Sequence, residues 1–232
     1  MQSGLPNSQP FESAVPKLLR INHPNVIKIY NYERKIPASI SDKPDQKVEI
    51  DRILMEYAPY GDLGSIMREG AIPQSEKFVR TIFHHLIEGI EYLHLCKIYH
   101  LNLRLDDLVI GKGHNVKILN YGFPHKPEAA LNYAAPELVY KKKIENEAAC
   151  DVYSAGIILF LLKFHLFPYV KEENSEDTIG MFETLMHSHE VYFEKMEKYY
   201  GNRFKGSTEF KNLFLRMTCR DPKSRISIKE IQ

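Results

Sequence analysis

The sequence predicts a fold of the α+β class, in which a few short strands accompany a larger part made mainly of helices. Residues 73–95 repeat large apolar side chains at intervals of three and four, the spacing of one helix face. Residues 151–162 are apolar around nearly the whole circumference of a helix, which is typical of a helix buried inside an α-rich body. Two short apolar runs around the glycine-containing turn at 111–115 predict a β-hairpin.

Length and composition indicate one or two globular domains. The 232 residues are 44% hydrophobic, enough for a sizeable core, and the net charge of +1 argues against a general nucleic-acid or anionic-membrane surface. The three cysteines form no Cys-x-x-Cys pair, which suits a reducing compartment. No signal-peptide pattern is present, and no apolar run reaches the ~18 residues of a membrane span. We therefore expect an intracellular, cytoplasmic protein that binds no nucleic acid and does not insert into a membrane.

The first part of the chain is expected to begin without regular structure. Residues 1–12 are rich in Ser, Pro, Gln and Asn, which is typical of a disordered lead. A short helix is expected from Ser13 to Ile21, with Pro16 near its first turn. The segment 23–25, with its central proline, ends this helix.

Strands follow this helix. Residues 26–30 are rich in β-branched and aromatic residues and predict a strand, and residues 53–55 predict the next one. Between them, residues 34–51 are charged and contain two prolines, which predicts a solvated loop.

The rest of the chain is expected to be helical apart from the hairpin, whose strands span 108–110 and 116–119. Helices are expected at 182–196 and 209–217. Asp151 is expected to cap the start of the buried apolar helix.

Polar residues gather at one end of the hairpin. His100, Asn102 and Asp107 precede its first strand, and Asn120 follows its second strand. Antiparallel strands bring these two groups to the same end, where they can form one site.

This stretch resembles the catalytic loop and metal-binding turn of protein kinases, whose pattern is His-Arg-Asp, four residues, Asn, and then Asp-Phe-Gly. His100 matches the histidine, Asp107 falls on the asparagine, and Gly122 falls on the last glycine. From about residue 14 onward the resemblance continues through three further motifs: Ala135-Pro136-Glu137, Asp151-Val152-Tyr153-Ser154-Ala155-Gly156, and Asp221-Pro222 followed by Arg225.

The resemblance implies a two-lobed protein-kinase-like fold with an incomplete small β lobe and a mainly α-helical large lobe. The small lobe would occupy residues 13–58 and the large lobe residues 59–232. Neither a Gly-x-Gly-x-x-Gly loop nor a Val-Ala-x-Lys strand occurs ahead of the short helix, and Ala14 falls where a glutamate normally stands. We therefore expect an N-terminally truncated domain without the first strands of its small lobe.

The resemblance also implies that the residues that perform phosphoryl transfer are changed. Asn102 takes the position of the catalytic base, and an amide cannot accept the substrate proton near neutral pH. Asn120 stands in place of the principal metal carboxylate, while Asp107 takes the position of a metal-binding asparagine. Arg104 replaces a lysine and keeps a cation suited to phosphate. Ala130 replaces the threonine that supports the substrate platform.

Other positions follow the kinase pattern, and the resemblance implies their roles. Glu137 would form a buried salt bridge with Arg225, and Asp151 would hold the backbone of the catalytic loop. The positions that would bind the nucleotide are Met55, Glu56, Ala58, Asp62 and Val109. The positions that would form the apolar stack between the lobes are Leu18, Ile29, His100 and Tyr121.

We interpret the chain as a catalytically inactive homologue of serine/threonine protein kinases, a pseudokinase in signalling that acts as a scaffold or as an allosteric partner of an active kinase. One alternative is a fragment of an ATP-binding serine/threonine kinase that phosphorylates proteins. A second alternative is a non-functional product of a truncated reading frame, suggested by the abrupt ends at Met1 and Gln232.

ATP and Mg²⁺ are expected to bind weakly, through Asp107 and Arg104, and without turnover. The alternative is that Asp107 only caps the turn before the strand. The incomplete small lobe is expected to leave an open strand edge and bare apolar surface around Leu18, Val26 and Ile29, which favours a protein partner.

Overall fold

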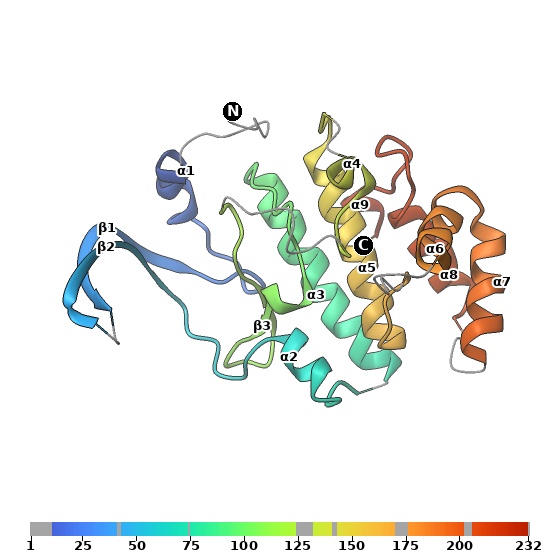
Figure 1. Ribbon diagram of the computed structural model, residues 1–232, viewed down its shortest axis with the longest axis horizontal. Coiled ribbons are helices and arrows are strands. Elements are labelled where there is room, and N and C mark those ends of the chain that lie inside the picture. The colour runs from blue at the N-terminus through green and yellow to red at the C-terminus, as the bar shows by residue number, and fades with distance from the viewer. Residues whose placement is uncertain are drawn as a thin grey trace.

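The computed structural model describes residues 11–40, 43–73, 75–123, 132–140, 143–169, 176–201 and 206–231. Within these residues, two small antiparallel sheets accompany a large body of helices (Figure 1). This content confirms the predicted α+β class. Residues 1–10 of the expected lead lie outside the described residues.

The chain reaches the body through α1 (Phe11–Leu18), which begins and ends earlier than the predicted helix. The strand expected at residue 26 begins only at Ile29, because the backbone ahead of it pairs elsewhere. Val26 forms an isolated parallel bridge with Ile118, and the Ile27 N–H donates to the Ile118 carbonyl at 2.9 Å. This segment therefore ties the N-terminal part to the hairpin that carries the candidate site.

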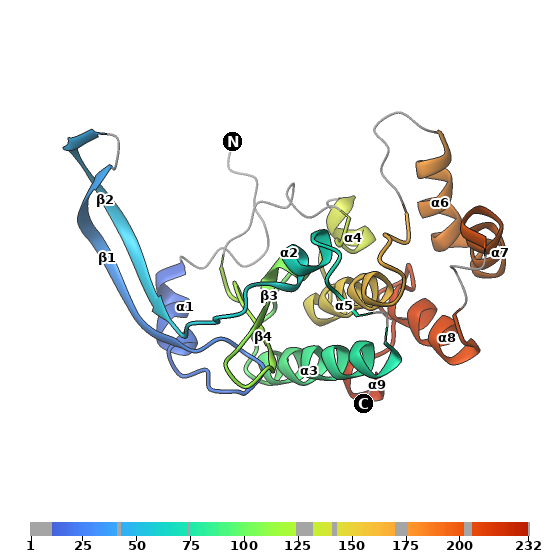
Figure 2. The same cartoon turned by 90° about the horizontal axis from the view of Figure 1, so that it is seen from below.

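The prediction of a loop at 34–51 is wrong. Most of these residues belong to a long hairpin of β1 (Ile29–Ile40) and β2 (Lys43–Met55). Pro37 misled the prediction, because proline is tolerated on an edge strand and both strands of a two-stranded sheet are edges. The hairpin projects from the helical body as an arm, at the end of the molecule opposite α6 (Glu176–His187) and α7 (His189–Tyr200) (Figure 2).

The second hairpin has both predicted strands, β3 (Leu108–Ile110) and β4 (Val116–Ile118), with Leu108 opposite Ile118 and with β4 ending one residue earlier than predicted. A 3₁₀ turn, η1 (Leu105–Asp107), leads into β3. A close turn at 111–115 joins the strands through a hydrogen bond from the Gly111 N–H to the Asn115 carbonyl at 3.0 Å.

Two long helices form the centre of the body: α3 (Glu76–Leu95), which confirms the predicted helix, and α5 (Glu147–Phe164), which packs against it. The predicted cap of α5 is wrong. Asn146 caps this helix by accepting a hydrogen bond from the Ala149 N–H at 3.1 Å, and Asp151 lies one turn further inside. The sequence did not distinguish the two candidate caps, because asparagine and aspartate are both good helix caps and these two lie only five residues apart.

The helix predicted at 182–196 is two helices, because Ser188 has a non-helical backbone and separates α6 from α7. Serine competes for backbone hydrogen bonds and so favours helix ends over helix interiors. The remaining helices lie around the central pair: α2 (Leu63–Arg68), α4 (Pro136–Val139), α6 (Glu176–His187), α7 (His189–Tyr200), α8 (Thr208–Met217) and α9 (Ile228–Ile231).

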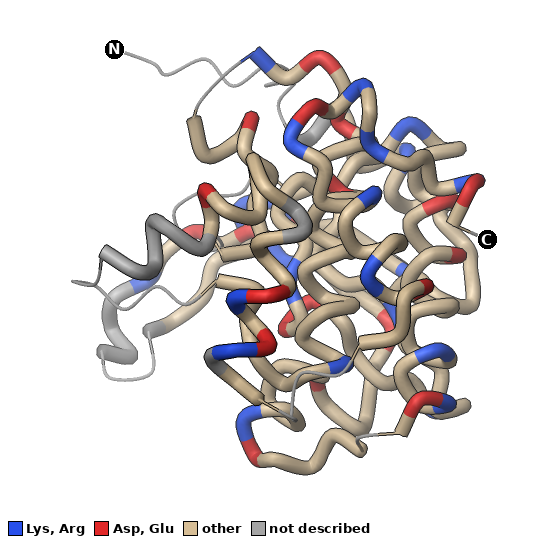
Figure 3. Tube along the Cα trace, turned by 90° about the vertical axis from the view of Figure 1, so that its right-hand side faces the viewer, with Lys and Arg blue, Asp and Glu red and all other residues tan. Residues whose placement is uncertain are grey.

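The prediction of bare apolar surface around three N-terminal residues is wrong. Leu18, Val26 and Ile29 are all buried in the core cluster that α3 and the β3–β4 hairpin share. Segments with lysine or arginine and segments with aspartate or glutamate are interspersed over the molecule in this view (Figure 3). Among the described residues, none of the helices combines the length and apolar character needed to cross a membrane.

Candidate functional site

The β3–β4 hairpin brings the two predicted polar groups into contact. Asp107 stands just before β3 and Asn120 just after β4, and the Asn120 Nδ2 donates a hydrogen bond to Asp107 Oδ1 at 2.8 Å. The carboxylate of Asp107 is buried. Asn120 has a left-handed backbone (φ 60°), which asparagine tolerates better than most residues.

The second oxygen of the Asp107 carboxylate is also occupied. Oδ2 accepts a hydrogen bond from the Arg104 N–H at 3.1 Å and lies 3.6 Å from the Arg104 Nε. The Asp107 carbonyl accepts from the Leu119 N–H at 2.8 Å, so this residue joins the turn before β3 to the end of β4. This geometry is that of a residue that caps a turn, the alternative considered for Asp107 from the sequence.

The Asp107–Asn120 pair does not fit Mg²⁺. Magnesium needs oxygen ligands directed at one point in near-octahedral geometry. Here the Asn120 amide presents a donor to the carboxylate, since a carboxylate can only accept. The Arg104 Nε also lies 3.6 Å from Asp107 Oδ2, and the positive charge of its guanidinium opposes a second cation at this carboxylate. Over the part of the chain that the structure describes, no group of three His, Cys, Asp or Glu side chains is placed to hold a metal ion.

A buried carboxylate from α5 holds the backbone of the loop that contains Asn102. Asp151 Oδ2 accepts from the His100 N–H at 2.9 Å, and Oδ1 accepts from the Leu101 N–H at 2.7 Å. Leu101 has a left-handed backbone (φ 61°), which is strained for a leucine. The carboxylate therefore stabilises a conformation that the chain would otherwise avoid, and places the half-buried Asn102 beside it.

Sequence reasoning missed one partner of this carboxylate. His94 Nε2 lies 2.8 Å from Asp151 Oδ2, so three groups converge on one buried acid. His94 is in the last turn of α3, and only the packing of α3 against α5 brings it to Asp151. A histidine near the end of an apolar helix face is the only signal that the sequence carries for this contact.

The four residues expected to form an apolar stack, Leu18, Ile29, His100 and Tyr121, are all buried, none more than 5% exposed. The Tyr121 hydroxyl donates to the Ile27 carbonyl at 2.7 Å, and burial raises the pKa of this hydroxyl far above its usual value. A side chain at Gly122, whose φ is +74°, would come within 2.7 Å of Leu18 Cδ2, so glycine is required there.

The expected nucleotide-binding positions lie around the end of β2 and the start of α2. Met55 ends β2, and the Glu56 carboxylate forms an ion pair with the Lys117 Nζ at 3.1 Å. Asp62 caps α2 by accepting from the Ser65 N–H at 2.7 Å and forms an isolated bridge with Val109 of β3. Both carboxylates thus have partners within the protein. Ala58 is half-buried in the turn between them.

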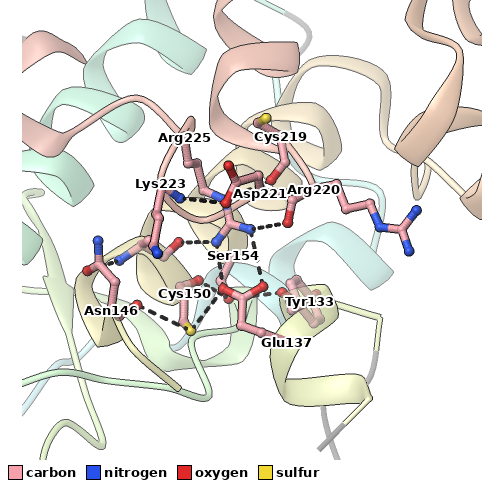
Figure 4. Close-up of polar contacts among 11 residues, drawn as sticks. Tyr133, Glu137, Asn146, Cys150, Ser154, Cys219, Arg220, Asp221, Lys223 and Arg225 are labelled. Carbon is pink, nitrogen blue, oxygen red and sulfur yellow. Dashed lines mark hydrogen bonds and ion pairs between the residues drawn. The ribbon is translucent and has the colours of Figure 1, made fainter. Parts of the chain in front are cut away.

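The Glu137–Arg225 pair lies in the helical body (Figure 4). The Arg225 guanidinium donates to both Glu137 oxygens, at 2.8 and 3.2 Å, and to the Ala149 carbonyl at 2.7 Å. The Cys150 thiol donates to Glu137 Oε1 at 3.2 Å, and burial together with this carboxylate raises the pKa of the thiol. The pair joins the start of α4 to the segment before α9.

Comparison with known proteins identifies the architecture. Residues 10–232 match the family model of the protein kinase domain. CBL-interacting serine/threonine-protein kinase 8 of Arabidopsis thaliana is 32% identical over 169 residues, which cover 68% of this chain and 34% of the relative. CBL-interacting protein kinase 11 of Oryza sativa subsp. japonica is 27% identical over 245 aligned residues, covering 100% of this chain and 43% of the relative. Serine/threonine-protein kinase GIN4 of Saccharomyces cerevisiae is 28% identical over 243 aligned residues, covering 99% of this chain and 19% of the relative. The chain thus spans less than half the length of each of these relatives.

Proposed function

This chain belongs to the protein kinase family, and we propose that it is a catalytically inactive member that works by binding proteins, as a scaffold or as an allosteric partner of an active kinase. Kinase domains generally use ATP and Mg²⁺. The observation that carries the proposal is the hydrogen bond between Asn120 and Asp107, at the two positions where the family pattern puts metal ligands. The two side chains bond to each other instead of directing their oxygens at a metal ion.

The position of the catalytic base gives independent support. Asn102 lies in a loop that Asp151 holds in place, so the loop is built although its carboxylate is replaced by an amide. An amide has no negative charge and cannot take the hydroxyl proton of a substrate near neutral pH. Proton acceptance therefore lacks the carboxylate that it requires, while the one carboxylate at the metal positions, Asp107, already accepts hydrogen bonds on both oxygens.

Binding of a protein partner is supported by what the chain keeps. The buried stack around Tyr121, the Asp151 carboxylate and the Glu137–Arg225 pair are all in place, so the sequence is suited to a stable fold. Two of the relatives are named as CBL-interacting kinases, and their names thus state an interaction with another protein.

The proposal is tested by incubating the chain with ATP, Mg²⁺ or Mn²⁺, and general protein substrates. We expect no phosphate transfer above the blank, because loss of a positioned acid–base group lowers the rate by about 10²–10⁴ and loss of the metal site lowers it further. Asn102→Asp alone should restore nothing, since the metal site stays closed. Asp106→Ala, which removes a surface carboxylate beside Asp107, is the matched control for Asp107→Ala. Transfer that Asp107→Ala abolishes and Asp106→Ala leaves intact would favour the alternative, an ATP-dependent serine/threonine kinase.

Calorimetric titration of ATP, with and without Mg²⁺, tests the metal site directly. We expect weak ATP binding that Mg²⁺ does not tighten, because both Asp107 oxygens already accept hydrogen bonds. The exchange Asp107→Asn with Asn120→Asp puts the carboxylate at the position where the family pattern has it. This variant should bind ATP more tightly with Mg²⁺ than without it. Magnesium-dependent binding by the unaltered chain, lost in Asp107→Ala, would contradict the closed pair.

A further inference from the structure

Two histidines stand at the ends of a series of hydrogen bonds that joins the segment before β1 to β4 and to α3. The His23 Nδ1 accepts from the Asn25 N–H at 3.2 Å. The buried Asn25 side chain donates through Nδ2 to the Val116 carbonyl at 2.9 Å. The Val116 N–H in turn donates to the His85 Nδ1 at 3.4 Å. Parts of the chain that are far apart in the sequence are therefore connected through two imidazole nitrogens.

Both rings are held by the surface on which they lie. His23 stacks on Tyr92 of α3, with ring centroids 4.8 Å apart, and the Tyr92 hydroxyl accepts from the Asn22 N–H at 3.1 Å. His85 belongs to α3, which packs against β4 (Figure 2). Both histidines are half-buried, so water replaces a lost bond there less readily than at an exposed site.

The two Nδ1 atoms can accept only while the imidazoles are neutral. A neutral imidazole has one acceptor nitrogen, whereas a protonated one donates from both nitrogens. Protonation of either ring would direct an N–H at the backbone N–H of Asn25 or Val116, and two donors cannot form a hydrogen bond. Histidine changes its charge between about pH 5 and 8. The series of bonds is therefore complete near neutral pH and interrupted in acid.

We propose that His23 and His85 form a proton-sensitive junction, which holds segment 22–27 on the β3–β4 hairpin near neutral pH and loosens that contact in mild acid. The proposal concerns the attachment of the N-terminal part to the hairpin. It holds equally for an inactive and an active kinase domain.

The junction lies next to the backbone that holds the end of β4. The Asn25 carbonyl accepts from the Ile118 N–H at 2.9 Å, and the Ile27 carbonyl accepts from the Tyr121 hydroxyl at 2.7 Å. Asn120, the partner of Asp107 in the candidate site, lies between these two points in the sequence. Loosening of segment 22–27 therefore removes support from the turn that contains Asn120.

The surroundings of both rings oppose protonation near neutral pH. Burial is the largest effect, and it lowers the pKa of His23 and of His85 from the usual 6.5. Glu88 of α3 acts on both rings and raises their pKa, whereas Lys117 of β4 lowers that of His23 and His84 lowers that of His85. The junction consequently opens only as the pH falls below 6.5.

Acid is expected to lower the stability of the chain through this junction. Each ring has a pKa near 6.5 in the unfolded chain and a lower one in the folded chain, so unfolding takes up protons below that pH. The free energy of unfolding should therefore fall as the pH falls from about 6.5 through the folded pKa values. Proton uptake by the two rings together can reach about two per chain.

A double variant without titratable rings tests this dependence. His23→Asn with His85→Asn places an amide oxygen close to the position of each Nδ1, and this acceptor cannot be protonated. Its urea midpoint should fall less than that of the unaltered chain between about pH 7.5 and about pH 5. His114→Asn is the matched control, because this histidine is exposed and asparagine tolerates its left-handed backbone (φ 58°). The control should keep the pH dependence of the unaltered chain.

Hydrogen exchange locates the effect. After correction for intrinsic rates, the Asn25 and Val116 amides should lose about fivefold in protection between neutral and mildly acidic pH, the factor for one net hydrogen bond. The Ile90 amide in the centre of α3 serves as the reference. The double variant should show no such loss. Equal losses at Asn25 and Val116 in the unaltered chain and in the double variant overturn the proposal.

A ¹⁵N NMR titration of the unaltered chain keeps the proposal testable if a variant fails to fold. The Nδ1 of His23 and of His85 should carry no proton near neutral pH, and both rings should titrate with midpoints below 6.5. A protonated Nδ1 on either ring in neutral solution would show that the ring donates there, and would overturn the junction.

Discussion

Arg225→Met is expected to lower the free energy of unfolding by about 3–5 kcal/mol, because it leaves the Glu137 carboxylate buried without its partner. Arg225 also donates to the Ala149 and Cys219 carbonyls, at 2.7 and 3.0 Å, and these acceptors lose a donor in the same substitution. Urea denaturation followed by circular dichroism measures the loss. The double variant Glu137→Gln with Arg225→Met should recover part of it, since no buried charge then remains unpaired.

Arg216→Met is the matched control for this experiment. Arg216 forms an ion pair with Glu230 at 3.2 Å, but both side chains are more than half exposed. Exposed pairs contribute little to stability, because water and salt screen them. The result that would contradict the buried pair is an equal change in urea midpoint for Arg225→Met and Arg216→Met.

Asp151→Ala is expected to lower the free energy of unfolding by about 2–6 kcal/mol. The buried N–H of His100 and the partly buried N–H of Leu101 lose their acceptor, at a cost of about 1–3 kcal/mol each. The loop should also relax, because the carboxylate holds Leu101 in its left-handed conformation. Hydrogen exchange at these two amides should therefore accelerate more than exchange in the centre of α3.

Asp106→Ala serves as the control here too, since it removes a neighbouring carboxylate that pairs with Arg68 at the surface. This variant should keep both the stability and the slow exchange of the loop amides. If Asp151→Ala matched it in urea midpoint and in exchange at His100 and Leu101, the carboxylate would have no role in holding the loop.

Local patterns predicted the elements that depend on local physics. The helical periodicity of α3 and the two apolar runs of β3 and β4 are visible in the sequence, because helix faces and hairpin turns involve residues close together along the chain. The β1–β2 arm was missed for the opposite reason. Its charged residues and Pro37 suggest a loop, and only the pairing of β1 with β2, which includes Ile36 opposite Ile50, makes it a sheet.

The candidate site was likewise only partly predictable from local patterns. The order of the motifs around Asp107 and Asn120 indicated the family from the sequence, and the family match confirms it. The hairpin pattern also indicated that the two residues lie at one end. What the pattern left open was whether their oxygens face a metal or each other, since that depends on side-chain orientation.

The sequence by itself determined the chemical groups at this site, because residue type decides that Asn102 and Asn120 carry amides and not carboxylates. Only the tertiary structure decided how those groups are used. The Asn120 amide closes on Asp107 because the ends of β3 and β4 lie side by side. Likewise, α3 and α5 must pack together before His94 can approach Asp151. Such contacts join residues far apart in the chain, and no local pattern records them.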